Sequence, residues 1–212
     1  LYKADISCAG GAKTYSTVIE ALENAKYKIW RDRDAIRNSL LANGHTNSAC
    51  RKLYNKDFIG TTRFEEGRKM HEDSFFVFCC FLKKPTVILR NAHIYYYRYN
   101  QNSASHADFS DACFDVLFFA DRKKVLASEH FPEFETEINN MLVKANIVML
   151  QLLCRTSYKK YKNDIRQCIR TVKRLKKHFV PRGTADKRFF LIVTNNLYGV
   201  YRIYNRLKSK KK

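Results

Sequence analysis

The chain has 212 residues, of which 45% are hydrophobic and 14% aromatic, so it has enough apolar side chains for one or two folded domains. Only seven Gly and three Pro occur, which excludes collagen-like and low-complexity proteins. The formal net charge is +20, and 19 Lys and Arg against two acidic residues place +17 of it in residues 155–212. A charge concentrated in this way attracts polyanions, either nucleic acid or an acidic membrane surface.

The cysteines and the apolar runs indicate the compartment. Seven cysteines occur, none in a C-x-x-C pair, and most lie in apolar stretches. This usage favours reduced core cysteines of a cytoplasmic protein over a disulfide framework or a zinc site. The longest uncharged apolar run, residues 74–82, is far shorter than the ~20 residues of a membrane span, and no signal peptide is visible. We therefore expect a soluble or peripheral protein.

Short strands and helices alternate in the first half of the chain. Strands are predicted for residues 4–8, ending in a turn at Gly10-Gly11, for residues 27–30 and for residues 49–54. Asp32 suits the N-cap of a helix over residues 34–42.

The apolar run of residues 74–82 has no helical or strand periodicity of its own. Glu72 and Asp73 at its start suit a helix N-terminus, so a buried helix is predicted rather than a buried strand. Residues 86–89 and 94–97 follow as two strands, because both are rich in β-branched and aromatic residues.

After about residue 107 only helical periodicity remains. Helices are predicted for residues 110–127, from Pro132 to residue 152, and for residues 158–179. The apolar stripe of a fourth helix consists of Phe190, Val193, Leu197, Val200, Tyr204 and Leu207. The sequence thus predicts a mixed α/β part, residues 1–106, and a basic all-helical domain, residues 107–212.

A series of motifs in residues 50–105 points to chemistry. Lys52-Leu53-Tyr54 ends a predicted strand, Phe64 and Gly67 follow in a loop, and Glu72-Asp73 open the buried helix. Downstream, the aromatic segment Tyr95–Arg98 precedes Ser103 and Ser105. Acidic residues at a helix start are commonly caps, so Glu72-Asp73 taken alone also admits a structural role.

In this order and spacing, the motifs resemble those of bacterial family 2 glycosyltransferases. The resemblance covers about residues 1–106 and implies the C-terminal, acceptor-side portion of a GT-A nucleotide-diphospho-sugar transferase fold, followed by a helical tail. It implies transfer of a sugar, with inversion, from a nucleotide-diphosphate sugar to a saccharide or lipid-linked acceptor.

The resemblance also implies roles for individual residues. Asp73 corresponds to the general base that takes the proton of the acceptor hydroxyl, and Glu72 beside it is a candidate to orient the acceptor or a neighbouring stretch of backbone. The candidate substrate-binding residues are His71, Lys52, Arg98 and Ser103. The cations Lys52 and Arg98 suit the diphosphate or the acceptor, because Arg in particular fits phosphate oxygens with two parallel hydrogen bonds.

Other parts of such an enzyme are expected outside this chain. The family's nucleotide-binding half and its D-x-D motif, which holds Mg or Mn, should precede Leu1. Without them, this chain alone is expected to be inactive. Asp32 and Asp34 do form a D-x-D string, but their place ahead of a helix favours capping. His93 and His106 have no cluster of other ligands in the sequence, so no metal site is predicted within the chain.

The basic segment suggests where the protein works. In a transferase of cell-surface polysaccharide synthesis, it would dock on the anionic inner face of the cell membrane. The alternatives are a nucleic-acid-binding protein driven by the same charge and a helical interaction module. No zinc finger, RNA-recognition motif or helix-turn-helix signature supports nucleic acid as the partner.

Overall fold

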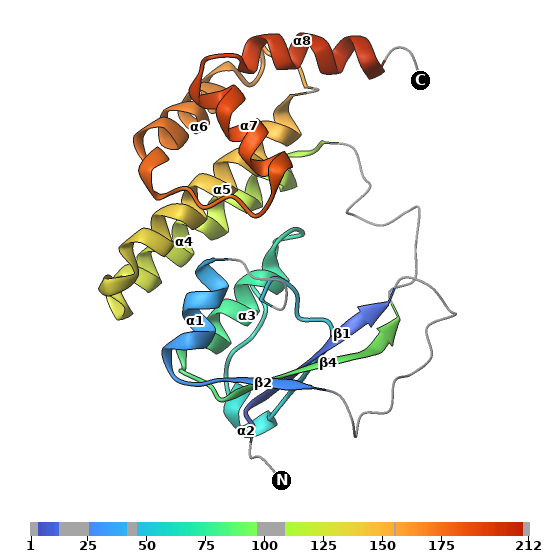
Figure 1. The fold of residues 1–212 in the computed structure, drawn as a ribbon, viewed down its shortest axis with the longest axis vertical. Helices are drawn as coiled ribbons and strands as arrows, with labels where there is room; N and C mark the ends of the chain where they lie inside the picture. Colours follow the sequence, from blue (N-terminus) through green and yellow to red (C-terminus); the bar gives the residue numbers. More distant parts are fainter. Residues whose placement is uncertain (1–3, 13–25, 42–45, 97–108, 155, 210–212) are drawn as a thin grey trace. The chain divides into compact units, whose positions relative to one another are not determined.

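The structure of the chain, a computed structural model, describes residues 4–12, 26–41, 46–96, 109–154 and 156–209 (Figure 1). The chain divides into two compact units, Leu1–Ala107 and Asp108–Lys212. The division predicted after residue 106 lies next to this boundary. As far as it is described, the first unit combines strands and helices and the second is helical, so the protein is of the α/β class.

A mixed sheet of four strands organises the described part of the first unit, in the order β2-β4-β1-β3. β1 (Ile6–Ala12) pairs in parallel with β4 (Val87–Tyr96) and antiparallel with β3 (Lys52–Tyr54). β2 (Tyr27–Trp30) pairs antiparallel with β4 on the other side. The parallel pair lies in the middle of the sheet, where strands are covered and apolar.

Two strands extend further than predicted. The turn predicted at Gly10-Gly11 is wrong, because β1 continues through both glycines with an irregular register against β4. Glycine tolerates such a bulge within a strand. The separate strands predicted for residues 86–89 and 94–97 are one strand, since β1 pairs with it on both sides of the polar stretch, at Leu89 and at His93.

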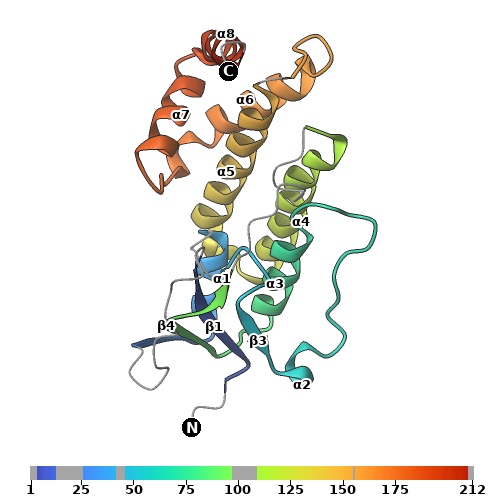
Figure 2. The same ribbon diagram turned by 90° about the vertical axis from the view of Figure 1, so that its right-hand side faces the viewer.

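The described helices of the first unit are α1 (Arg33–Leu40), α2 (Lys56–Ile59) and α3 (Glu72–Leu82). α1 and α3 pack side by side on the same side of the sheet (Figures 1 and 2). α3 begins at Glu72 as predicted, and it is apolar all round because it is buried, with Phe78 and Phe81 fully enclosed. Asp32 occupies the N-cap position of α1, but the predicted cap is wrong, since its side chain makes no capping hydrogen bond.

The second unit is built around α5 (Glu135–Leu153), which packs against α4 (Asp115–His130) and α6 (Lys162–Arg174). Single 3-10 turns precede or follow these helices at residues 111–114, 132–134 and 176–178. The core of the unit is apolar, and its fully buried side chains include Phe119, Phe131, Met149, Leu150, Leu153 and Ile165.

The fourth predicted helix is two helices, α7 (Thr184–Thr194) and α8 (Tyr198–Ser209). The chain turns between them at Asn196, whose φ of 63° lies in the left-handed region that asparagine tolerates. The predicted apolar stripe therefore does not continue as one buried face. Val193 on α7 is fully buried, whereas Val200 on α8 is 65% exposed.

Tyr198 and Arg202 attach α8 to the C-terminal end of α5. The Tyr198 hydroxyl donates to the carbonyl of Leu150, and the Arg202 guanidinium donates to the carbonyls of Leu153 and, at 2.7 Å, Thr156. The guanidinium also lies 5.9 Å from the ring centre of Tyr198, and Arg202 is only 5% exposed. The last carbonyls of a helix have no partner within it, so side-chain donors stabilise them.

Replacing Arg202 by Lys is expected to lower the free energy of unfolding of the second unit by about 1–3 kcal/mol, because one ammonium cannot reproduce a planar, two-carbonyl contact. Urea unfolding followed by circular dichroism at 222 nm measures this change. Arg188, exposed on α7, provides the matched control, and Arg188→Lys should leave the transition unmoved. Equal midpoints for the two variants would contradict the anchoring role.

Candidate active site

Three of the four motifs meet at one aromatic residue of α3. Phe76, 6% exposed, stacks on Phe64 with ring centres 4.4 Å apart and planes at 9°. The ring of Tyr54 meets Phe76 edge-on, with centres 5.6 Å apart. The strand motif, the loop motif and the helix motif are thus held together in space.

Asp73 lies on the same side of α3 as this aromatic cluster, because residues three apart on a helix are neighbours. The side chain is half-buried, and its Oδ1 accepts a hydrogen bond of 2.6 Å from the backbone N–H of Ser74. This bond is a local structural role within the first turn and not an N-cap, since the N-cap position of α3 is His71. In the described part of the chain no hydrogen bond engages Oδ2, so this oxygen is available for a proton.

Lys52 is a cation whose charge interacts with this carboxylate. It is half-buried at the start of β3, and its Nζ donates to the carbonyl of Ser48. Burial lowers the pKa of Lys52, while the carboxylate of Asp73 acts in the opposite direction. The structure therefore places two of the predicted site residues, one acidic and one basic, within electrostatic reach of each other.

Tyr54 was not predicted as a site residue, although it belongs to the same motif as Lys52. Residues two apart on a strand share a face, so Lys52 and Tyr54 turn to the same side of β3, while Leu53 between them is 75% exposed. Burial holds the pKa of Tyr54 well above its usual value, so the hydroxyl stays protonated. That hydroxyl is buried and has no hydrogen-bond partner among the described residues.

Cys8 contributes a neutral thiol to the same neighbourhood. Burial raises the pKa of Cys8 to about 11, and the cations of Lys52 and Arg51 oppose this shift only in part. Near neutral pH the thiol is protonated and is therefore a poor nucleophile. The chemistry of the cluster accordingly depends on the carboxylate and the ammonium.

His71 and Glu72 shape the entrance to α3. His71 occupies the N-cap position with a φ of 66°, a left-handed conformation in which histidine is enriched among non-glycine residues. Its carbonyl accepts the N–H of Phe75 at 3.0 Å, which starts the helix. Glu72 is half-buried in the first turn, directly before Asp73. Because the chain turns at His71, Glu72 and Asp73 are the first two residues of α3.

The fourth motif is only partly described. Tyr95 lies in β4 and is 36% exposed. Tyr97, Arg98, Ser103 and Ser105 lie outside the described residues, as does His106. The proposed contacts of Arg98 and Ser103 with substrate therefore remain predictions.

Two of the cavities in the described chain lie elsewhere. One, in the first unit, has a volume of about 530 Å³ and is lined by the D-x-D string with Arg31, Arg33 and Lys84. Three cations beside two carboxylates disfavour a divalent metal there. Across the residues with described positions, no group of three or more His, Cys, Asp or Glu is suited to hold a metal ion.

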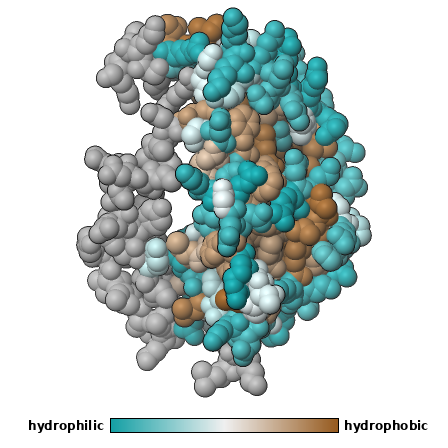
Figure 3. Space-filling view, turned by 180° about the vertical axis from the view of Figure 1, so that it is seen from behind, coloured by the Kyte–Doolittle hydropathy of each residue, from teal (hydrophilic) through white to brown (hydrophobic). Residues whose placement is uncertain are grey.

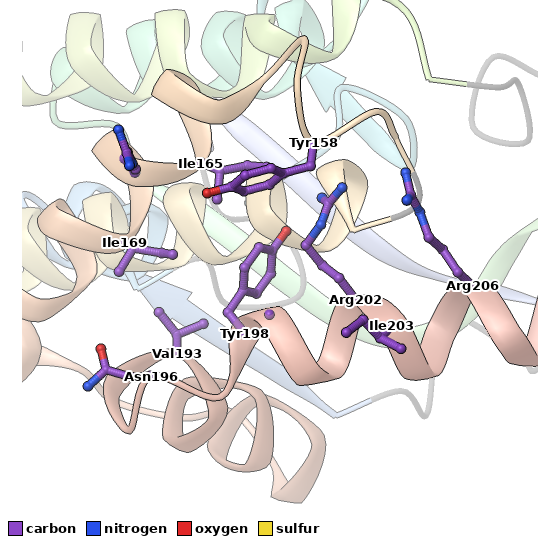
Figure 4. A pocket seen from close by; sticks show the side chains of 11 residues that line it. Tyr158, Ile165, Ile169, Val193, Asn196, Tyr198, Arg202, Ile203 and Arg206 are labelled. Atoms are coloured by element: carbon purple, nitrogen blue, oxygen red, sulfur yellow. The ribbon is translucent and has the colours of Figure 1, made fainter.

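The second cavity, of about 380 Å³, lies within the second unit between α6 and α8 (Figure 4). Tyr158 and Tyr198 face each other across it, and Arg202 and Arg206 rise from α8 beside them. None of the 11 residues that line it is acidic. Arg202 is not part of the apolar stripe predicted for this segment, yet it is only 5% exposed.

Comparison with known proteins does not show a family for this chain. No protein-family model matches it, and no curated protein matches it. Of the helices in the described ranges, none is both long enough and apolar enough to cross a membrane.

Proposed function

We propose that this chain is the acceptor-side part of an inverting family 2 glycosyltransferase of the GT-A fold. The observation that carries the proposal is that residues of the strand and loop motifs contact α3, the helix that Glu72 and Asp73 begin. Phe76 contacts both Phe64 and Tyr54, and Asp73 and Lys52 are coupled at the same place. A structural cap alone would need none of these neighbours.

The proposed reaction is an in-line substitution at the anomeric carbon. The acceptor hydroxyl forms the new C–O bond as Oδ2 of Asp73 takes its proton, and the nucleoside diphosphate leaves with the electrons of the bond that breaks. The attack from the opposite face inverts the configuration. In this proposal Glu72 and His71 orient the acceptor, and Lys52, with Arg98, offers positive charge to the diphosphate or the acceptor.

A divalent metal, Mg or Mn, is part of the proposal by resemblance alone. Its ordinary contribution is to neutralise the charge of a leaving diphosphate. The described residues do not form a site that fits such an ion, as the D-x-D string shares its cavity with three cations. In this proposal the ligands of the metal lie mostly outside this chain.

The proposed partners are a nucleotide-sugar donor, a saccharide or lipid-linked acceptor and an anionic membrane surface. The membrane surface suits residues 155–212, which carry 19 Lys and Arg against two acids. A cation near such a surface contributes about 1 kcal/mol at best. The proposal places the protein in the cytoplasm, peripheral at the inner face of the cell membrane.

The decisive experiment uses the full-length protein that carries this chain. A panel of nucleotide sugars, each offered with saccharide and lipid-linked acceptors, is expected to contain a pair that releases nucleoside diphosphate only when both are present. Nuclear magnetic resonance of the product should show an inverted anomeric centre. A chelator should stop the release, and Mg or Mn should restore it. Retention of configuration, or no transfer from any donor, would refute the proposed function.

A further inference from the structure

α8 turns its apolar face outward. Four hydrophobic side chains share one side of the helix, Val200, Ile203, Tyr204 and Leu207, and Leu197 directly precedes it; all five are between 50% and 65% exposed. Hydrophobic surface is visible at the upper end of Figure 3, where α8 lies. We call these five residues the α8 apolar face.

The opposite side of the helix faces the body of the second unit. Tyr198 and Arg202 are 3% and 5% exposed, and Arg206 donates to the carbonyl of Thr156 at 2.6 Å. An amphipathic helix of a globular protein ordinarily buries its apolar side. Here the end of α5 requires hydrogen-bond donors, so the polar side of α8 is turned inward and the apolar side remains uncovered by the described residues.

The charges beside this face are positive. Ile203 of the α8 apolar face also lines the 380 Å³ cavity, together with Arg166, Arg202 and Arg206. Arg166 is exposed on α6. An apolar face bordered by cations matches the boundary between the headgroups and acyl chains of an anionic bilayer. Duplex nucleic acid offers phosphates to the cations but nothing to the apolar face, and a second copy of the chain would bring like charges together.

We propose that α8 binds an anionic membrane, with its apolar face buried at the headgroup boundary and with Arg166 at the lipid phosphates. This inference goes beyond the electrostatic docking of the basic segment, because it names an element that enters the bilayer. It does not depend on sugar transfer, so it stands or falls separately from the proposed function. Apolar burial is not screened by salt, whereas the attraction of surface charges is.

The test compares two double variants of the full-length protein that have the same net charge. Ile203→Gln with Leu207→Gln removes part of the α8 apolar face. Val125→Gln with Val148→Gln removes two exposed valines, 64% and 37% exposed, from α4 and α5. Because all four positions are exposed, both proteins should fold, which circular dichroism verifies.

Sedimentation with vesicles of phosphatidylcholine and phosphatidylglycerol measures the partition coefficient. The Ile203/Leu207 variant is expected to bind at least about tenfold more weakly than the control, since each apolar side chain adds to interfacial affinity. The unaltered protein should retain part of its binding at about 1 M salt, where the Debye length is about 3 Å. In a Tyr204→Trp variant, brominated lipid should quench the tryptophan fluorescence that arises at position 204.

Three results would overturn the proposal. One is equal binding of the two double variants, and another is complete loss of vesicle binding at high salt, since either reduces the interaction to charge alone. The third is salt-sensitive binding to duplex RNA or DNA with none to vesicles, which would assign the cations to nucleic acid.

Discussion

Asp73→Asn is expected to lower kcat for sugar transfer about a thousandfold, within the range that a positioned general base contributes. Asparagine keeps the size of the side chain and an oxygen that can still accept the N–H of Ser74, a bond of 2.6 Å in the structure. It cannot take the proton of the acceptor hydroxyl. Donor binding should be nearly unchanged, because the loss concerns the chemical step.

The matched control for Asp73→Asn is Asp57→Asn. Asp57 is also an acid in the first turn of a helix, α2, but it is exposed and lies outside the aromatic cluster. Steady-state kinetics of nucleoside diphosphate release, with donor affinity from isothermal titration, measure both variants. Near-normal turnover of Asp73→Asn with an unchanged thermal midpoint would leave Asp73 with only its local hydrogen bond to the Ser74 N–H. Glu72→Gln should have a smaller effect than Asp73→Asn, since orienting an acceptor is a lesser role than taking its proton.

Phe76→Ala is expected to destabilise the first unit by about 3–5 kcal/mol, the usual cost of removing a buried aromatic ring. Phe76 is 6% exposed and contacts both Phe64 and Tyr54, so the substitution removes packing from three motifs at once. Trp30, the single tryptophan of the chain, is 5% exposed in β2 and reports unfolding of the first unit through its fluorescence.

Phe76→Leu keeps much of the volume and should cost less than half as much as Phe76→Ala. Under conditions where both variants are folded, Phe76→Ala should also raise the KM for the acceptor, because the loop of Phe64 loses the surface on which it stacks. Loss of stability with unchanged acceptor KM would mean that the aromatic cluster supports the core of the unit without arranging the site.

Local sequence signals were sufficient for the start of α3 and for the strand of Tyr27–Trp30. Glu72 and Asp73 before an apolar run predicted a buried helix, and the structure has α3 from Glu72 to Leu82. This inference succeeds because charges at a helix start and burial of a continuous apolar run act within one segment. The alternation of a strand also predicts that Lys52 and Tyr54 share one face of β3, although only Lys52 was predicted for the site.

The neighbouring strands decided how far β1 and β4 extend, which the local sequence did not predict. Gly10-Gly11 has the composition of a turn, yet β4 lies beside it and the strand continues. Arg90 interrupts an apolar pattern, yet β1 pairs with β4 both before it, at Leu89, and after it, at His93, so β4 is one strand. Such residues have weak preferences of their own, and hydrogen bonds to a neighbouring strand outweigh them.

The amino-acid sequence by itself determined the division into a mixed and a helical part, the start of α3 and the motifs from Lys52 to Asp73, because each depends on residues close together in the chain. Only the tertiary structure decided that Phe76 joins three of those motifs and that α8 turns Arg202 inward and Val200 outward. The orientation of α8 follows from carbonyls at the end of α5, and hydrophobic periodicity contains no information about a distant helix end that needs hydrogen-bond donors.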